Sequence, residues 1–414
     1  MGLRDRARQL FDVACRAADP GLALTRALRD APLPRPDAGG RLIVVAVGKA
    51  AVPMAEALIA ALPDPAQAVV LVVTNYENAR PVAGAEVMAA GHPVPDANGA
   101  AAAVAVERLL AAASEADRVV ALVSGGGSAL LPAPVDGVTL GDKAATSRLL
   151  LGGGLDITQM NQVRQGLSRL KGGGFLRAAA PAPVCGFILS DVIGDDLRVI
   201  ASGLTVAPIA THAATRALLR EAGLWDRLPP SVRTALARPD PATAPPPARN
   251  HLIGSNRLSL EAVQAAAGPS ARIASDRLTG DVADAAAIII AAAREAEADA
   301  CLIFGGETTV TLRGTGLGGR NQELALRVAL AMPDLGRDWC FLSGGTDGRD
   351  GPTDAAGGLV DAGTPRRLRD AGVDAQALLA DNDSHRALAA AGDLLLTGAT
   401  GTNVADVQIL LTGR

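Results

Sequence analysis

Short apolar runs alternate with Ala-rich amphipathic stretches from about residue 42 to the end of the chain, and this alternation limits the folds available to it. The clearest runs are at 42–47, 68–73, 118–123, 184–190, 301–305 and 339–344. Runs of this length between helical stretches are typical of α/β proteins with a mainly parallel sheet. Further strands are expected at 251–254, 271–275, 308–313 and 407–412, and one or two helices are expected within the first 30 residues.

The chain has 414 residues, more than one ordinary domain, so we predict two domains. The stretch RPDPATAPPPARN at 238–250 contains five prolines within ten residues, which is typical of a stiff, extended connection. We therefore expect an N-terminal domain at 1–237, a linker at 238–250 and a smaller C-terminal domain at 251–414.

Composition excludes several classes of function. Aromatic residues make up only 2% of the chain and the net charge is −4, so base stacking and general attraction to nucleic acid are both disfavoured. The longest apolar run, at 285–293, is about half a membrane span, and the charged first ten residues do not resemble a signal peptide. Four cysteines lie far apart, which favours buried thiols in a reducing cytoplasm and excludes a thiolate metal site.

Only three of the 39 basic residues are lysines: Lys49, Lys143 and Lys171. Ammonium and guanidinium groups differ in size and donor geometry, so a lysine retained in an Arg-rich chain indicates a place where arginine does not fit. Lys49 and Lys171 adjoin glycines and are candidates for a site. Lys143 lies in a polar helical stretch and is expected to be exposed to solvent.

Glycine-rich or polar clusters follow most of the predicted strands. Ligands of open parallel sheets bind beyond the carboxyl ends of the strands. Several such clusters at one edge favour a site that surrounds a multiply charged anion with backbone amides, although one glycine pair alone is equally well explained by a tight turn. The clusters are Gly48-Lys49, then Ser124, Gly125, Gly126, Gly127 and Ser128, and then residues 190–196, 305–307, 314–323 and 344–348.

Two glycine-containing stretches of the chain partly match familiar nucleotide-binding motifs. The GKAA sequence after the first strand lacks the spacing and the terminal hydroxyl of a Walker A loop. Residues 314–319 satisfy GxGxxG, but the next predicted strand does not end in the acid that would hold a ribose, which disfavours NAD binding. His92, between two prolines, is more typical of a loop-shaping residue than of a general base.

Carboxylates lie at or just past several strand ends: Asp191, Glu307 and Asp347. Such groups can hold Mg²⁺ together with phosphate oxygens, or accept the proton of an attacking hydroxyl. Each alone would also fit a turn or a helix cap. Lys49 and Arg320 would supply compensating positive charge for a phosphoryl group in transfer.

An ordered set of motifs resembles the class II glycerate 2-kinases, whose second half is called the MOFRL domain. The matching stretches run nearly from end to end: 47–51, 91–99, 124–140, 160–174, 189–205, 254–262, 305–326, 341–361 and 397–411. The resemblance implies Mg²⁺-requiring transfer of a phosphoryl group from ATP to the 2-hydroxyl of D-glycerate. It also implies an N-terminal Rossmann-like αβα domain, a smaller αβ domain, and an active site in the cleft between them.

The resemblance also assigns residues. It implies that Lys49, Arg320 and Asp191 are catalytic and that Asp191 and Asp347 bind metal. It implies cofactor binding by Glu307 and Asn403, with less support for Lys171 and Arg164. The glycine cluster Ser124, Gly125, Gly126, Gly127 and Ser128 is assigned to the cofactor as well. If Asn403 joins the site, the last ~25 residues return to the N-terminal domain.

Two other functions stay open. One is NAD(P)H-dependent hydroxypyruvate reduction, a name that some members of this family have carried, with residues 314–319 as the cofactor loop. The other is a sensor without catalytic activity, since fold does not fix function. A homodimer is also left open. No nucleic-acid or membrane partner is expected.

Overall fold

The computed structural model describes residues 2–413, and these form two compact units. The larger unit contains residues 20–190 and 195–253. The smaller unit contains the residues up to 19, residues 191–194, and the chain from 254 onward. Both are α/β structures with one six-stranded sheet each.

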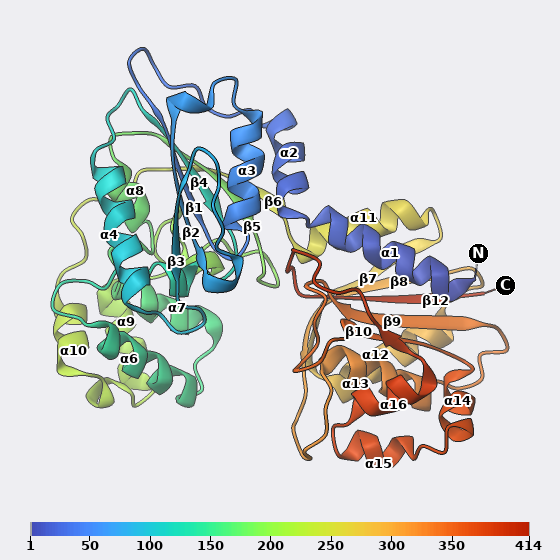
Figure 1. Cartoon of the computed structure of the whole chain (residues 1–414). Helices are drawn as coiled ribbons and strands as arrows, with labels where there is room; N and C mark the ends of the chain where they lie inside the picture. The colour runs from blue at the N-terminus through green and yellow to red at the C-terminus, as the bar shows by residue number, and fades with distance from the viewer. Residues whose placement is uncertain (1, 414) are drawn as a thin grey trace. The chain divides into compact units, whose positions relative to one another are not determined.

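The sheet of the larger unit has the strand order β3-β2-β1-β4-β5-β6. The pairs β1–β2, β1–β4, β2–β3 and β4–β5 are all parallel. Every residue of β1 is buried, because helices cover both faces of the sheet, with α3 on one face and α4 on the other (Figure 1). The larger unit therefore has the doubly wound arrangement that the sequence predicts.

The strands of the larger unit are β1 (Leu42–Val47), β2 (Ala68–Asn75), β3 (Glu86–Ala90), β4 (Arg118–Val123), β5 (Val184–Leu189) and β6 (Arg249–Gly254). Its α-helices are α2 (Pro20–Asp30), α3 (Ala51–Ala61), α4 (Ala97–Ala111), α5 (Gly127–Leu130), α6 (Leu140–Gly152), α7 (Ile157–Gly166), α8 (Gly174–Ala179), α9 (His212–Glu221) and α10 (Pro230–Ala237). Short 3-10 helices are η1 (Pro65–Gln67), η2 (Tyr76–Asn78), η3 (Ile200–Ser202) and η4 (Trp225–Arg227).

The sheet of the smaller unit has the order β11-β10-β9-β12-β8-β7, and most of its pairs are antiparallel. Only β7 and β8 pair in parallel. A mainly parallel sheet therefore describes the larger unit alone. The last strand of the chain, β12, lies between β8 and β9, so these two strands run in the same direction.

The strands of the smaller unit are β7 (Ala271–Asp281), β8 (Cys301–Thr309), β9 (Trp339–Gly345), β10 (Gly357–Asp361), β11 (Leu394–Leu395) and β12 (Asp406–Thr412). Its helices are α1 (Leu3–Ala17), α11 (Asn256–Ala267), α12 (Val282–Glu295), α13 (Arg320–Ala331), α14 (Thr364–Asp370), α15 (Ala375–Ala380) and α16 (Ser384–Ala391).

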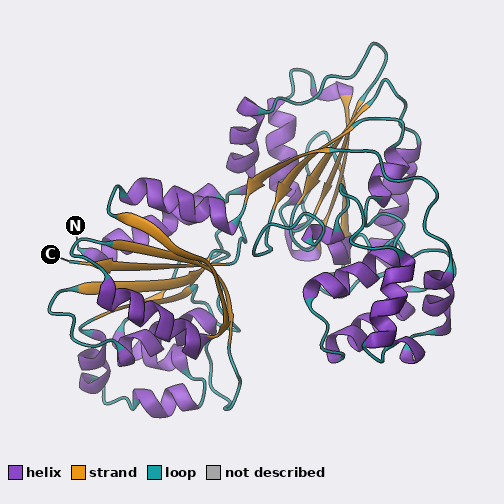
Figure 2. Ribbon diagram, turned by 180° about the vertical axis from the view of Figure 1, so that it is seen from behind, coloured by secondary structure: helices purple, strands orange, loops and turns teal. Residues whose placement is uncertain are grey.

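Alternating side chains of this second sheet enter two separate apolar cores. In β8, Ile303 packs with α1 and α11, whereas Phe304 packs with α12 and α13. Leu342 and Phe341 divide in the same way in β9. This period of two is what a sheet with helices on both faces requires, and Figure 2 shows the two helical layers.

The division into units differs from the expected domains at three points. Helix α1 belongs to the smaller unit, because Phe11 is fully buried among residues of β8, β9 and β12. The Pro-rich stretch 238–250 lies in the larger unit and leads into β6, an edge strand of that unit's own sheet, so the unit boundary comes after residue 253. The chain end does not return to the larger unit, since β12 is internal to the second sheet.

Strand positions were predicted well where the apolar run is continuous. β1 and β4 have the expected bounds. Residues 308–313 do not form a separate strand: β8 extends to Thr309 and a loop follows. β3 and β10 were missed, because EVMAA and GGLVD are short and weakly apolar. Among residues 2–413, no helix has the length and apolar character needed to cross a membrane.

We expect Phe11→Ala to lower the free energy of unfolding of the smaller unit by about 3–5 kcal/mol, the usual effect of deleting a buried phenylalanine ring. Urea unfolding can be followed by Trp339 of β9 in a Trp225→Phe background. The exposed Val104→Ala should change stability by less than about 0.5 kcal/mol. An unchanged Trp339 transition in Phe11→Ala would contradict the placement of α1.

Candidate functional site

The loops after β1 and β4 meet at the centre of the first sheet. The strand order reverses between these neighbours, and ligands of doubly wound sheets bind at such a point. The Lys49 amide donates to the Gly125 carbonyl at 2.8 Å, and the Ala50 amide donates to Ser124 Oγ at 3.1 Å. Gly48 has φ +125°, and a Cβ there would lie 2.1 Å from Ser124 Oγ, so only glycine fits this contact.

The loop after β4 leaves a group of backbone donors available. In the described part of the chain, the amides of Gly125, Gly126, Gly127 and Ser128 donate to no protein acceptor. Gly126 has φ +86°, the left-handed conformation that lets successive amides point to one side. We refer to residues 124–128 as the amide loop. Its unpaired amides form a place where an oxyanion can bind.

Lys49 and His92 flank this loop. A Cβ on Gly126 would lie 3.2 Å from Lys49 Cγ and 3.1 Å from His92 Cδ2. Burial and the Lys49 charge lower the pKa of His92, and Glu77 opposes them in part. A neutral imidazole is therefore favoured near the lysine, which fits the expected structural role of His92.

Lys171 lies beneath the amide loop and is only 3% exposed. Its Nζ donates to the carbonyl oxygen of Ser128 at 2.6 Å and to Ser128 Oγ at 3.1 Å. Burial, followed by the charges of Lys143 and Arg164, lowers the pKa of Lys171. Arg164 of α7 is half-buried, and burial lowers its pKa as well.

The expectation that Lys143 is exposed was wrong. Its side chain is 7% exposed, and Nζ donates to the carbonyl oxygens of Pro132 at 2.5 Å and Leu167 at 3.2 Å. Burial, then the charges of Arg164 and Arg169, lowers the pKa of Lys143 to about 7. Its polar sequence neighbours concealed a residue that points inward from α6.

In the smaller unit, Arg320 is the centre of a charged cluster. Its Nε and Nη2 donate to the two oxygens of Asp406 at 2.6 and 3.0 Å, and Nη1 lies 2.8 Å from Glu307 Oε1. Asp406 opens β12 and pairs in register with Gly306 and Gly345. The start of β12 and the ends of β8 and β9 therefore lie at one edge of the sheet.

The electrostatics of this cluster follow from burial. The Asp406 side chain is fully buried, and burial raises its pKa to about 6 against the opposing effect of Arg320. Burial lowers the pKa of Arg320, but the hydrogen bonds and charge of Asp406 outweigh it, so the net shift is upward. Arg320 is thus a permanent cation held in one orientation, with its partner Glu307 half exposed.

The GxGxxG loop at 314–319 differs from the amide loop. Its glycines allow close packing: a Cβ on Gly314 or Gly316 would lie 2.1 or 2.4 Å from Asp381 or Asp383. The protein itself accepts from its amides, with Thr315 N bonded to Asp381 and Leu317 N to Asp383.

Asp350 fills the start of the helix that follows. It accepts from Asn321 N at 3.1 Å and from Gln322 N at 2.8 Å. A Cβ on Gly319 would lie 2.3 Å from Asp350 Cγ, so glycine permits this approach. Two of the amide donors that a dinucleotide pyrophosphate could use at this helix are therefore occupied.

The remaining predicted site residues lie near the same edge of the second sheet or follow β5. Asp347 follows β9, and its Oδ1 accepts from Arg349 N at 3.0 Å. Asn403 Oδ1 accepts from Ala405 N at 3.2 Å, and Thr346 Oγ1 bonds Ala405 O at 2.6 Å, so the 346–347 and 403–405 segments adjoin. Asp191 follows β5 and is grouped with the smaller unit.

Asp191 and Asp347 are suited to a metal ion whose other ligands are phosphate oxygens and water molecules. Among residues 2–413 no three Asp, Glu, His or Cys side chains form a cluster able to hold a metal ion. Mg²⁺ in kinases is commonly bound through one or two carboxylates, with phosphate oxygens and water completing the octahedron. Asp191 and Asp347 fit that donor chemistry.

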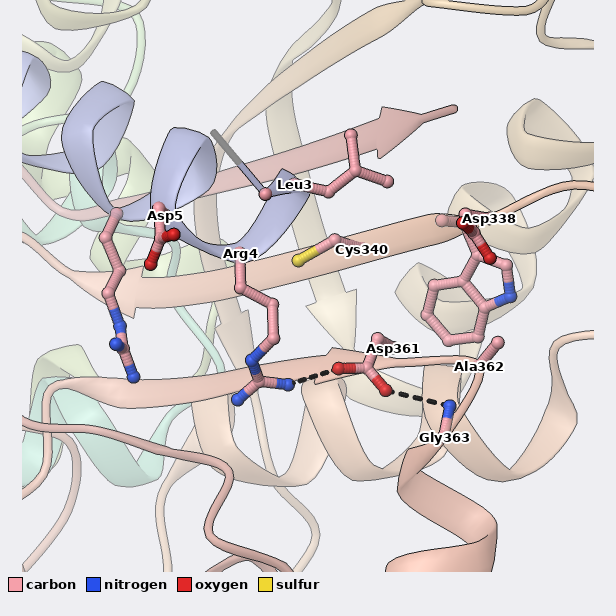
Figure 3. A pocket seen from close by; sticks show the side chains of 11 residues that line it. Leu3, Arg4, Asp5, Asp338, Cys340, Asp361, Ala362 and Gly363 are labelled. Carbon is pink, nitrogen blue, oxygen red and sulfur yellow. Dashed lines mark hydrogen bonds and ion pairs between the residues drawn. The ribbon is translucent and has the colours of Figure 1, made fainter. Parts of the chain in front are cut away.

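A pocket of about 450 Å³ lies elsewhere on the smaller unit. Figure 3 shows Arg4 of α1 pointing toward Asp361, whose second oxygen accepts from the Gly363 amide. The pocket adjoins the start of β9 and the end of β10, which is the opposite edge of the sheet from Arg320. Ion pairs within the chain already use its principal charges, so we exclude it as the candidate site.

Sequence reasoning missed Asp406, Asp350 and Ser202. Asp191 and Glu307 were identified as acids at the carboxyl end of an apolar strand. Asp406 is also an acid beside an apolar strand, but it lies at the amino end, where no ligand site was expected. Asp350 stands in a polar loop of many acids, where nothing in the sequence distinguishes it. Ser202, whose Oγ lies 2.8 Å from Ser128 Oγ, has no local signal.

The comparisons with known proteins cover the whole chain. Residues 6–237 match a family described as a domain of unknown function (DUF4147), and residues 300–406 match the MOFRL family. Glycerate 2-kinase of Pyrococcus horikoshii is 37% identical over 99% of this chain and 98% of its own. The crystal structure of glycerate kinase from Thermotoga maritima is 37% identical and has a TM-score of 0.92, with 99% of both chains covered.

The chain belongs to the glycerate 2-kinase family.

One relative in this family has a different name. A protein of Agrobacterium vitis, provisionally named a hydroxypyruvate reductase, is 40% identical over 98% of this chain and 94% of its own. The two names correspond to the two enzymatic functions that the sequence left open. The expected family and the α/β fold are confirmed.

We expect Lys143→Met to reduce the rise of stability with pH above neutrality. The pKa of Lys143 falls from 10.5 to about 7 on folding, so between these values the unfolded chain binds a proton that the folded chain does not. Stability of the wild type therefore increases with pH over this window, by at most about 1.4 kcal/mol per unit for one proton. Urea unfolding at several pH values between 7 and 9.5 should show a smaller slope for the variant, and equal slopes would contradict the assignment.

Proposed function

We propose that this chain is a glycerate 2-kinase, which transfers the γ-phosphoryl group of ATP to the 2-hydroxyl of D-glycerate and releases ADP. The observation that carries this is the set of four unpaired amides at the centre of the larger sheet, beside Lys49. Phosphate groups are the natural ligands of such a loop. The similarity to glycerate kinases over the whole chain supports the acceptor.

The proposal assigns the nucleotide phosphates to the amide loop. The amides of Gly125–Ser128 donate to phosphate oxygens, and Lys49 offsets their charge. Asp191 and Asp347 would hold Mg²⁺, which when bound neutralises phosphate charge.

Four free cysteines among the described residues support the proposed cytoplasmic location, because thiols persist in reducing compartments.

Arg320 is assigned to stabilise negative charge on the transferring group. Asp406 fixes its guanidinium through two hydrogen bonds, so little reorganisation accompanies the reaction. Glu307, which pairs with Arg320, and Asn403 are assigned to bind the cofactor. Asp191 is the proposed acceptor of the 2-hydroxyl proton, and positioning with electrostatics supplies most of the rate. A site formed by residues of both units stays a prediction.

Hydride transfer is the weaker alternative. It needs residues 314–319 to bind the nicotinamide cofactor, yet Asp381 and Asp383 of the protein accept from amides of this loop. Asp350 accepts from two amides at the start of the helix that follows. A bound pyrophosphate would add negative charge where three carboxylates already lie. The charges of this loop therefore oppose the reductase function.

A coupled assay tests the proposal. With D-glycerate, ATP and Mg²⁺, we expect ADP release and a product that enolase converts at once, as 2-phosphoglycerate would be. ADP release without enolase turnover would show that another hydroxyl or acceptor is used. No ADP release, together with NADH consumption in the presence of hydroxypyruvate, would establish the reductase instead.

We expect Arg320→Ala to lower kcat by about 30- to 1,000-fold, which corresponds to about 2–4 kcal/mol of barrier and to the loss of one preorganised charge partner. The same coupled assay measures the effect. Arg294→Ala, which removes an exposed arginine from α12, is the control and should keep wild-type kcat. A folded Arg320→Ala enzyme with more than a third of wild-type kcat would remove Arg320 from the mechanism.

A further inference from the structure

All three lysines of the chain contact one short segment, residues 125–132. The backbone amide of Lys49 bonds Gly125, the Nζ of Lys143 bonds the Pro132 carbonyl, and the Nζ of Lys171 bonds Ser128. The contacts of Lys143 and Lys171 are made by the side chain, and of these two Lys171 bonds a residue of the amide loop itself.

Lys171 begins a continuous chain of hydrogen bonds. Its Nζ donates to Ser128, whose Oγ lies 2.8 Å from Ser202 Oγ, and Ser202 Oγ donates to Asn161 Oδ1 at 2.7 Å. Asn161 belongs to α7, a helix of the larger unit (Figure 1). The last residue of the amide loop is therefore tied to a helix through buried or half-buried polar groups.

The turn that carries Ser202 has an unfavourable backbone conformation. Ala201 and Ser202 have φ values of +48° and +58°, which residues with a Cβ rarely adopt. The turn is held by the segment that follows Lys171: Gly172 N donates to Ser202 O at 3.1 Å and Gly173 N to Gly203 O at 2.9 Å. The backbone amides of Gly172 and Gly173 thus hold the turn, and the side chain of Lys171 holds the amide loop.

The ammonium group of Lys171 has no carboxylate partner in residues 2–413. The charged groups that influence it most are Lys143 and Arg164, which are also cationic. Burial without an ion pair disfavours the charged form of a lysine, which is why the pKa of Lys171 is lowered. Lys171 therefore acts on the amide loop through the hydrogen bonds that its Nζ donates to Ser128, which both forms of the amine can make.

We propose that Lys171 is a positioning residue for the amide loop: through Ser128 it fixes the unpaired backbone amides of residues 125–128 to receive an oxyanion of the nucleotide phosphate. This rests on the proposed function and replaces the expected direct contact between Lys171 and the cofactor. A compact ammonium fits this buried position and bonds both the carbonyl and the hydroxyl of one serine, whereas a guanidinium is larger and its donors lie in a fixed plane.

The test compares two buried lysines. Lys171→Met should raise the Kd and the KM for ATP roughly tenfold or more, the equivalent of losing one charge-assisted hydrogen bond, with KM for D-glycerate nearly unchanged. Lys143→Met removes an equally buried ammonium that bonds Pro132 and Leu167 but not Ser128. This control should alter stability and leave the Kd for ATP near the wild-type value.

Two further variants separate positioning from charge. Ser202→Ala breaks the same series of hydrogen bonds and should raise the Kd for ATP less than Lys171→Met does. The double variant should bind ATP no more weakly than Lys171→Met alone. Lys171→Arg keeps the charge but loses the geometry and should stay impaired. Full recovery by arginine would show a purely electrostatic role and overturn the proposal.

Isothermal titration with ATP separates this inference from the kinase proposal, because it needs no turnover. If the wild type binds ATP but does not phosphorylate glycerate, the kinase proposal fails and the Kd values still decide the role of Lys171. If Lys171→Met does not fold, Ser202→Ala decides, and an unchanged Kd in that variant overturns the inference. Equal effects of Lys171→Met and Lys143→Met, or no binding of ATP by the wild type, would overturn it as well.

Discussion

The bidentate ion pair between Arg320 and Asp406 is the interaction on which the smaller unit's site depends. A fully buried carboxylate without a partner would be strongly unfavourable, so Asp406 at the start of β12 requires the guanidinium that opens α13. Glu307, at the end of β8, bonds the same guanidinium. One arginine therefore fixes two strands and one helix relative to each other, and its own orientation is determined by the same contacts.

Glycine has opposite effects in two glycine-rich loops of this chain, because it leaves backbone amides unpaired in one loop and lets carboxylates pair with them in the other. In the amide loop, glycine lets the backbone turn so that its amides have no protein acceptor among residues 2–413. In the 314–319 loop, glycine lets the backbone approach Asp350, Asp381 and Asp383, which then accept from its amides and from the following helix. A glycine motif alone cannot tell these cases apart, because the difference lies in which acids pack against it.

The sequence was informative where the determinant is local. β1 and β4 are continuous apolar runs, and the turns after them contain the glycines that their contact requires, so this half of the candidate site could be predicted. Lys143 and Asp406 could not, because their burial comes from packing against segments far away in the chain. The unit boundary was misplaced for a related reason: a run of prolines indicates an extended chain but not which unit it packs on.

The position of β12 has a consequence for how the protein is made. Its strand lies between β8 and β9, so the second sheet stays in two parts until β12 has been synthesised. Helix α1, which is made before the larger unit, packs on that same sheet and its packing is complete only when β12 is present. The larger unit, by contrast, is complete once residue 253 has left the ribosome, apart from the 191–194 excursion. The unit with the amide loop can therefore fold before the rest of the second unit has been made, whereas the unit with Arg320 can complete its sheet only once β12 has been made.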